Sequence, residues 1–460
     1  MNVSLKLQGI NGATTKKKAK SFELRLINTS TEPGMTINFP VNSTNTSPDL
    51  RFMPQPNAYP GDTSFQTMKI VNLPSSQTGQ FKIGSYDGGG WTTLIAEAIL
   101  DDGTIVQGKL LVSGGERDIR IPKREANSMI AEAWLKANGN PLDTDDIETS
   151  KDNRNNGDGF TAYEEYRGVI SKMEFGNHHP NNFGRLKPNK KELGIWATRR
   201  DFIFFDEGIK WFKDASKLEI IHFDFDRDEI APDGKLNMNA KSAHDFDQYA
   251  LFLLNGGLGG TLGRVYTKTG NGPNIPAQIQ SVVADWNEIR NTYQSRVNWT
   301  RPETLKFAVN EYLAQTVAHE LGHAVAVWHH GSDHRLDNYD AVNKKYVPYT
   351  VSTISDRIRL FDRRGNLITD RPQTLFYVGA QAGTVESGDL SCMLNYYPYY
   401  RWGFTRGADG AAIYHQEPLI PLGKIFCKTK TGTDFNATQF YFSDCAGGKG
   451  NCWGQIKLRN

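Results

Sequence analysis

Cysteine is scarce in this 460-residue chain and absent from most of it. Its four cysteines all come late, at Cys392, Cys427, Cys445 and Cys452. No two of them form a C-x-x-C pair, so the sequence has neither the ligand spacing of a zinc ribbon nor a thioredoxin-like redox motif. Three disulfide pairings are open to four cysteines.

Long apolar runs and an excess of one charge are also lacking. The longest apolar segment, residues 249–254, is far shorter than the roughly 20 residues that cross a bilayer. Residues 1–25 lack the hydrophobic core of a signal peptide, so any cleaved leader is absent from this sequence. The 53 basic and 51 acidic side chains leave a formal net charge of +2. We therefore predict no membrane span, and neither nucleic acid nor a membrane as the main partner.

The composition that remains is typical of a globular protein with more than one domain. Hydrophobic residues make up 38% and charged residues 23%, and 44 glycines indicate many turns. A chain of this length predicts roughly two to four domains. Short alternating runs at residues 22–27, 68–71 and 104–112 stand between clusters of Gly, Pro, Ser and Asn. Such a period of two predicts an immunoglobulin-like all-β sandwich over residues 1–120.

One short segment, His319-Glu320-Leu321-Gly322-His323, combines two imidazoles with a carboxylate. Residues four apart on an α-helix share one face, so His319 and His323 can bind one zinc ion while Glu320 projects beside it. Residues 300–303 have the form of a capping box, and apolar residues follow at helical spacing. We predict one helix over residues 301–326. Two surface histidines on an ordinary amphipathic helix are the alternative.

A catalytic zinc site needs a third protein ligand and an open fourth position. The candidate histidines that follow are His329, His330 and His334. In a continuous helix His330 would lie about 10 Å beyond His323 along the axis, whereas a zinc–nitrogen bond is about 2 Å long. The chain must therefore turn back after the helix. We choose His329 as the third ligand and keep the other two as alternatives.

The pattern H-E-x-x-H-x-x-A-x-x-H resembles the extended zinc motif of the metzincin clan of endopeptidases, which is followed by a methionine turn beneath the metal. In that motif a glycine stands where this chain has Ala326. A left-handed alanine costs roughly 1–2 kcal/mol, which is small beside the roughly 10 kcal/mol of structural zinc binding. The resemblance implies that Met393 forms the methionine turn, within Ser391-Cys392-Met393-Leu394-Asn395-Tyr396-Tyr397. Tyr396 and Tyr397 are the candidate hydrogen-bond donors to the transition state, although the family's tyrosine stands one residue closer to the methionine.

The same resemblance implies an α+β catalytic domain over residues 176–400 that hydrolyses peptide bonds in a protein or peptide substrate. Glu320 would take a proton from a zinc-bound water and pass it to the leaving amine. Metzincins bind the substrate as an extended strand along a sheet edge. The glycine-rich segment 254–266 is the candidate edge, and a flexible turn between two buried strands is the alternative.

Residues 152–168 resemble an EF-hand-like calcium loop of the kind found in secreted bacterial proteins. With Gly159 as the sixth position of the loop, a glutamate falls at the twelfth. The first position holds Arg154, which cannot bind a cation, so an earlier aspartate would have to take its place. We assign residues 121–175 to this helical calcium segment; an acidic linker with a helix starting at 162–167 is the alternative. The predicted ligands are Asp152, Asn156, Asp158, the carbonyl of Phe160, and Glu165.

Residues 401–460 are rich in Gly, aromatic and polar residues and would have little core of their own. We predict a small C-terminal extension stabilised by a disulfide such as Cys427–Cys452. Disulfides persist outside the cytoplasm, so the protein is predicted to be secreted or periplasmic; four reduced thiols are the alternative.

Two functions of different class remain open: a zinc endopeptidase, and a catalytically inactive protein of the same fold that binds surface polymers or proteins through its β-domain. Glu320 favours the enzyme, because inactive relatives of enzymes commonly lose the base. A zinc peptidase with a glutamate as third ligand would need a helix after His334 that carries it, and Glu386 stands in no helical pattern.

Overall fold

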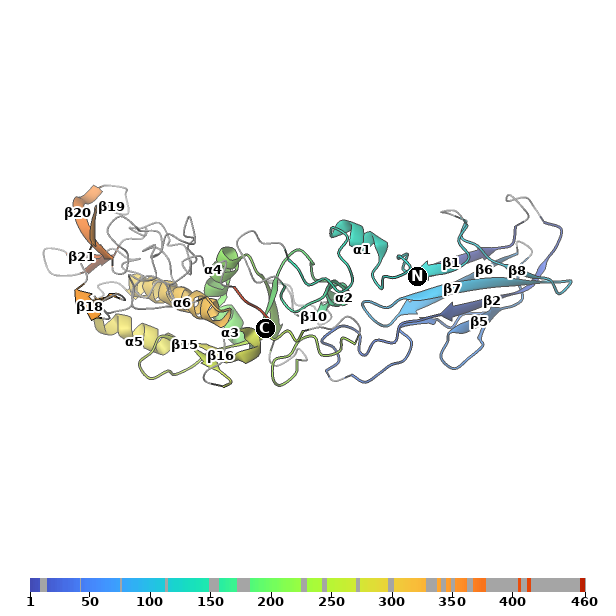
Figure 1. Ribbon diagram of the computed structural model, residues 1–460, viewed down its shortest axis with the longest axis horizontal. Helices are drawn as coiled ribbons and strands as arrows, with labels where there is room; N and C mark the ends of the chain where they lie inside the picture. The colour runs from blue at the N-terminus through green and yellow to red at the C-terminus, as the bar shows by residue number, and fades with distance from the viewer. Residues whose placement is uncertain are drawn as a thin grey trace. The chain divides into compact units, whose positions relative to one another are not determined.

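The computed structural model divides the chain into two compact units (Figure 1). Unit 1 comprises Met1–Ile147, Gly159–Asn189 and Arg227–Asp247, and unit 2 comprises Glu148–Asp158, Lys190–Asp226 and Gln248–Asn460. Most of the predicted calcium segment thus belongs to unit 1, and the predicted C-terminal extension belongs to unit 2. The structure describes residues 1–8, 15–41, 43–74, 77–111, 115–148, 157–171, 183–224, 230–241, 246–269, 274–296, 302–327, 337–340, 345–348, 352–361, 367–377, 404–406, 412–414 and 456–459.

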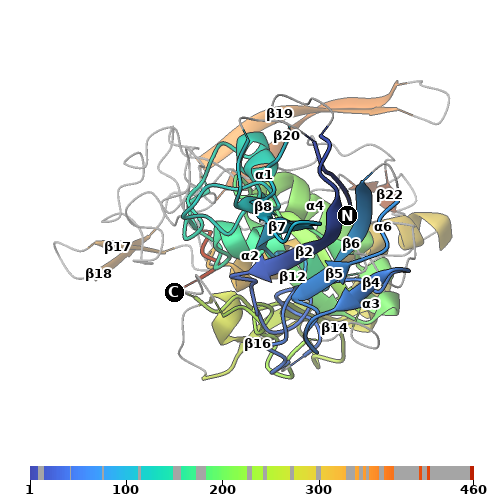
Figure 2. The ribbon, with the colours of Figure 1, turned by 90° about the vertical axis from the view of Figure 1, so that its right-hand side faces the viewer.

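Unit 1 is built on two antiparallel sheets (Figure 2). One has the strand order β1-β6-β3 and the other β4-β5-β2-β7-β8, with β9 also paired to β7. Alternate residues of a strand face opposite sides of its sheet, so Phe22 and Leu24 of β2 enter a core that Phe81 and Ile83 of β6 share. The strands are β1 (Asn2–Lys6), β2 (Ala19–Ile27), β3 (Leu50–Phe52), β4 (Ala58–Pro60), β5 (Thr67–Ile70), β6 (Thr78–Ser85), β7 (Thr92–Leu100), β8 (Ile105–Gln107) and β9 (Ile119–Ile121).

A buried arginine joins parts of unit 1 that are far apart in the sequence. Arg167, at the end of α2, is fully buried and donates to Asp87 Oδ2 at 2.5 Å. It also donates to the carbonyl oxygens of Pro33 and Asn239, each at 2.7 Å. A buried guanidinium is stable only when its donors are satisfied, so these bonds fix the segment after α2 within the unit. The remaining elements of unit 1 are α1 (Glu132–Ala137), α2 (Ala162–Arg167), β10 (Val169–Ile170) and β11 (Phe183–Gly184).

Unit 2 contains a five-stranded mixed sheet with the order β13-β12-β14-β16-β15. Neighbouring strands are parallel except for β15, which is antiparallel to β16 and forms one edge. The strands are β12 (Glu192–Ala197), β13 (Glu219–Asp224), β14 (Leu251–Asn255), β15 (Gly263–Thr267) and β16 (Ile279–Ala284). The edge segment predicted at 254–266 therefore divides into the end of β14, a glycine-rich loop and most of β15.

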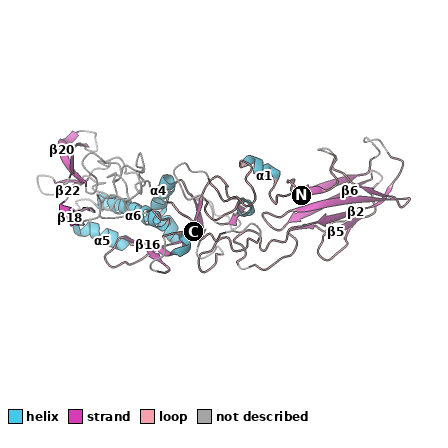
Figure 3. Cartoon of the chain, viewed as in Figure 1, coloured by secondary structure: helices cyan, strands magenta, loops and turns pink. Residues whose placement is uncertain are grey.

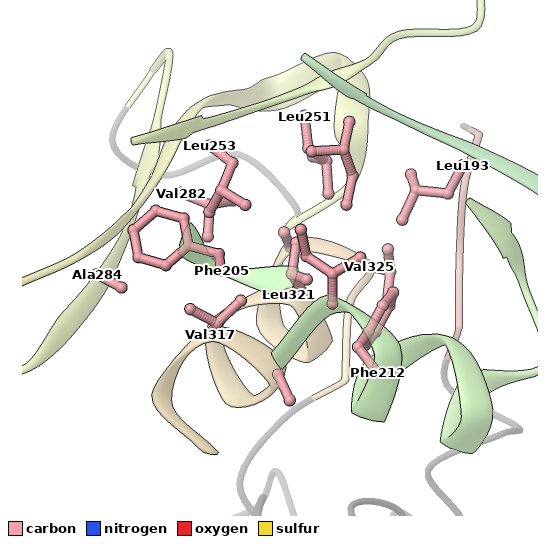
Figure 4. Packing of buried hydrophobic residues seen from close by; sticks show 14 of the residues in the cluster. Leu193, Phe205, Phe212, Leu251, Leu253, Val282, Ala284, Val317, Leu321 and Val325 are labelled. Carbon is pink, nitrogen blue, oxygen red and sulfur yellow. The ribbon is translucent and has the colours of Figure 1, made fainter. Parts of the chain in front are cut away.

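Helices gather in unit 2, whereas the N-terminal part of unit 1 is formed mainly by strands (Figure 3). Figure 4 shows part of the core of unit 2, a cluster to which Phe212 of α4, Leu321 of α6, and Leu251 and Leu253 of β14 belong. Gly208 of α4 lies so close to α6 that a Cβ there would come within 2.6 Å of the Cβ of Val317. The helices are α3 (Arg199–Phe204), α4 (Asp206–Ser216), α5 (Trp286–Arg296) and α6 (Pro302–Ala324), with a short 3-10 turn at Pro276–Gln278.

The described residues after α6 include three antiparallel strand pairs. They are β17 (Asp337–Asp340) with β18 (Lys345–Pro348), β19 (Ser352–Phe361) with β20 (Leu367–Tyr377), and β21 (Phe404–Arg406) with β22 (Ala412–Tyr414). Within the residues that the structure describes, no helix combines the length and the apolar character needed to cross a membrane.

Asp49 in unit 1 is a buried carboxyl group close to other acids. It is 3% exposed, and its Oδ2 accepts the backbone N–H of Glu32 at 3.0 Å. Burial raises its pKa to about 7, and the charge of Asp87 adds to the shift, while the Ser30 hydroxyl opposes it. The folded protein therefore holds this proton more tightly than the unfolded chain does.

The difference in the pKa of Asp49 between the folded and unfolded states determines how the free energy of unfolding depends on pH. Stability due to Asp49 is fully present below its unfolded pKa and is lost as the pH rises through about 7. We expect the parent to lose roughly 2–4 kcal/mol between pH 5 and pH 8.5 from this group, and Asp49→Asn to avoid that loss. Denaturant titrations of both proteins at the two pH values measure the difference. Parallel losses in parent and variant would contradict this assignment.

Candidate functional site

Helix α6 confirms the helix predicted over residues 301–326 but ends earlier, at Ala324. The backbone N–H of Ala326 donates to the carbonyl of His323 at 3.1 Å, and that of Val327 to Gly322 at 3.0 Å. These two bonds form a Schellman motif, which needs a left-handed residue just after the helix. Ala326 takes that conformation, with φ +69°. The chain thus turns away from the helix axis at the residue where the zinc motif usually has glycine.

The two histidines of α6 converge. The Nε2 atoms of His319 and His323 lie 3.0 Å apart, and the ring planes are perpendicular. Two nitrogens bound to one tetrahedral zinc at about 2.0–2.1 Å would lie about 3.3 Å apart, so the pair fits a shared ion closely. All residues from Leu313 to Val325 are buried except these two, which are partly exposed.

A backbone carbonyl fixes the ring of His323. Its Nδ1 lies 2.7 Å from the carbonyl oxygen of Val327, which accepts only, so Nδ1 must carry the proton. The lone pair of the neutral ring is then on Nε2, the atom that faces His319. Burial lowers the pKa of His323 to about 4, while the bond to Val327 opposes the shift. His323 keeps some exposure to solvent, but the direction of the shift favours the neutral ring that binds metals.

Glu320 lies on a different face of α6, where it meets the edge strand. The residue is 9% exposed, and burial raises the pKa of its carboxyl group to about 8. A Cβ at Gly263 of β15 would lie 2.7 Å from Cγ and from Oε1 of Glu320, and 2.6 Å from Cγ2 of Thr316. The strand can approach the helix this closely only because residue 263 has no side chain. The carboxylate is therefore held between its own helix and the sheet edge.

Several predicted site residues lie outside the described residues. These are the third-ligand candidates His329, His330 and His334, the methionine-turn residues Met393, Tyr396 and Tyr397, all four cysteines, and Asp152 and Asn156 of the calcium loop. Their assignments stay predictions.

The described part of the predicted calcium loop is divided between the units, with Asp158 in unit 2 and residues 159–165 in unit 1. Gly159, the sixth position, has φ +101°, and the carbonyl-bearing Phe160 and the acidic Glu165 are both buried. Helix α2 follows at once and begins with a capping box, in which the Thr161 hydroxyl accepts from the N–H of Glu164. Glu165 thus lies in the first turn of a helix.

Asp158, the fifth position, accepts the N–H of Glu192 at 2.6 Å. Carboxylate oxygens of Glu148 and Asp158, both in unit 2, lie within 4.8 Å of one another. Of these, only Asp158 was predicted from the sequence. The pair specifies neither zinc nor calcium.

Two parts of the candidate metal site had no clear signal in the sequence. The carbonyl of Val327 acts through the backbone, which every residue possesses, so no residue type reveals it. Gly263 stands among other glycines in the predicted edge segment, and only its contact with Glu320 distinguishes it.

The close approach at Gly263 predicts a specific sensitivity. Gly263→Ala should lower the free energy of unfolding by about 1–3 kcal/mol, because the new methyl group overlaps Thr316 and Glu320. Gly257→Ala is the matched control, since the nearest atom to a Cβ there is Asp285 Oδ2 at 4.0 Å, and its effect should stay within about 0.5 kcal/mol. Thermal or denaturant unfolding measures both. Equal effects of the two variants would show that the strand is free to move away.

Comparison with models of known protein families, with curated proteins and with solved structures finds no match to this chain.

Proposed function

We propose that the protein is a zinc-dependent endopeptidase with a metzincin-like catalytic unit, in which His319 and His323 hold the metal and Glu320 is the general base. The observation that carries this proposal is the geometry of the two rings. Their Nε2 atoms lie 3.0 Å apart, and the Val327 carbonyl keeps the proton of His323 on Nδ1. Between Leu313 and Val325 the two rings belong to the only residues that are not buried, and Nε2 of His323, which does not carry the proton, faces the ring of His319.

The third ligand in this proposal is His329. Support comes from the turn at Ala326, whose left-handed backbone ends α6 three residues before that histidine. A helix that continued straight would carry the following residues away from His323 along its axis.

Zinc bound by these residues would acidify a water molecule and polarise the scissile carbonyl. The task left to Glu320 is to accept a proton and return it to the leaving amine. Its buried carboxyl group, with a pKa of about 8, suits a group that takes and gives protons near neutral pH. Positive charge beside the carboxylate would lower that pKa and favour its basic form.

The substrate in this proposal is an extended peptide that adds a strand beside β15. Two features support it. Strand β15 is the edge of its sheet, and Gly263 of this strand contacts the carboxylate of Glu320. A peptide paired to this edge would have its backbone bonds close to the base. The sequence argument for a secreted or periplasmic enzyme is part of the same proposal and rests on its cysteines.

Substitution of the base tests the enzyme directly. Glu320→Gln should lower the rate of peptide hydrolysis by about 10²–10⁴-fold, because proton transfer is lost, while zinc content stays stoichiometric. Glu207→Gln is a suitable control, because Glu207 is an exposed acid on the neighbouring helix α4. Zinc is measured by elemental analysis and hydrolysis with a quenched peptide library.

The outcomes separate the candidate functions. Equal hydrolysis by the parent and Glu320→Gln would refute the mechanism. A parent that binds zinc but cleaves nothing would instead favour an inactive binding protein of the same fold.

We also propose that the loop at residues 152–165 binds calcium. The left-handed Gly159 and the buried Glu165, placed in the first turn of α2, fit the sixth and twelfth positions of such a loop. Calcium should raise the melting temperature of the parent. Glu165→Gln should weaken calcium binding by about tenfold or more, whereas Glu125→Gln, an exposed acid in the same predicted segment, should not. Calorimetric titration decides the matter, and a parent that takes up no calcium would end the proposal.

A further inference from the structure

The last described residues of the chain form part of the core of unit 2. Ile456 is 2% exposed and Leu458 is 1% exposed, and both belong to the cluster that contains Leu321 of α6. Lys457 and Arg459, which alternate with them, are only partly buried. This alternation is that of an extended segment with one face on a core. The C-terminal residues are thus packed like a strand and contribute to the unit that carries the histidines.

The segment also makes a backbone contact with the turn after α6. The N–H of Lys457 donates to the carbonyl of Val325 at 3.0 Å. Val325 stands between the last residue of the helix and the left-handed Ala326, and its side chain is fully buried. The last carbonyl groups of a helix have no partner within the helix. Those of Gly322 and His323 are satisfied by the Schellman motif, and that of Val325 is satisfied by the distant Lys457.

This contact is linked to His323 through a short stretch of backbone. Val325 and Val327 flank Ala326 and are both buried, and the carbonyl of Val327 accepts the Nδ1 proton of His323. Alanine has no preference for the left-handed conformation, so contacts outside the helix must hold the turn. If the turn relaxed, the acceptor for Nδ1 would move, and the ring could rotate or change tautomer.

We propose that the C-terminal segment Ile456–Leu458 is a positioning element of the metal site, which holds the turn after α6 so that the Val327 carbonyl orients His323. This inference rests on the proposed zinc function. It assigns a role in the site to residues that follow His323 by more than a hundred positions in the sequence.

Removal of a single hydrogen-bond donor tests this role. Lys457→Pro removes the N–H but fits an extended backbone, whereas Lys457→Ala keeps the N–H and is the matched control. Zinc affinity is measured by competition with a chromophoric chelator. We expect Lys457→Pro to weaken zinc binding by about tenfold or more, as loss of a group that orients a ligand does, and Lys457→Ala to stay within about twofold of the parent.

Amide hydrogen exchange in the zinc-free proteins provides a second readout. The N–H groups of Ala326 and Val327 should exchange faster in Lys457→Pro than in Lys457→Ala, with no matching change in the strands of the sheet. Faster exchange throughout unit 2 would indicate general loosening and would overturn the inference. If Lys457→Pro does not fold, Leu458→Ala should show the same two effects in weaker form, and unchanged zinc affinity in that variant would equally overturn it.

The two proposals fail in different ways. Zinc binding by the parent, with equal affinity in Lys457→Pro and Lys457→Ala, overturns the positioning role and leaves the enzyme proposal intact. A parent that binds no zinc overturns the proposed function first.

Discussion

The burial of α6 between the sheet and α4 is the constraint on which the candidate site depends. From Leu313 to Val325 the helix is buried at every position except His319 and His323. A helix so enclosed cannot rotate without exposing Val317 or Leu321, each of which contributes to the core. Burial of apolar surface stabilises the fold in proportion to the area removed from water. The core therefore fixes the orientation of the face of α6 that carries the imidazoles. Because Gly208 has no side chain, α4 can pack closely against α6.

The turn that ends α6 affects the candidate site as much as the packing of the helix faces does. A Schellman turn with alanine in the left-handed position costs free energy, roughly 1–2 kcal/mol, which the surrounding contacts must offset. Those contacts come from the buried side chains of Val325 and Val327 and from the backbone of the C-terminal segment. The same turn provides the acceptor that selects the tautomer of His323. The packing of the helix end and the orientation of the His323 ring thus depend on the same short piece of backbone.

In unit 1, by contrast, buried polar groups join segments that are far apart in the sequence. Arg167 is fully buried, and its bonds reach Asp87 and two backbone carbonyls from other parts of the chain. Such a group stabilises the fold only when all of its donors are satisfied, and removal of one partner would leave a buried charge. Asp49, a buried acid that holds its proton tightly, also belongs to unit 1. The end of α2 is therefore tied by specific bonds to segments of unit 1 that lie outside its strands.

Local pattern alone predicted the helix that carries H-E-x-x-H and the alternating runs at 22–27, 68–71 and 104–112, which overlap β2, β5 and β8, because each follows from the spacing of neighbouring residues. The turn after the helix was expected from the short reach of a zinc–nitrogen bond, and the structure places it at Ala326. The chain's grouping into units, the contact of Gly263 with Glu320 and the packing of Ile456 and Leu458 were decided only by the tertiary structure. These features bring together residues that are far apart in the sequence, in some cases by more than a hundred positions. Helical and strand periodicity report which face of an element is apolar, but not which other element covers it, and a backbone carbonyl such as that of Val327 has no signature in the sequence at all.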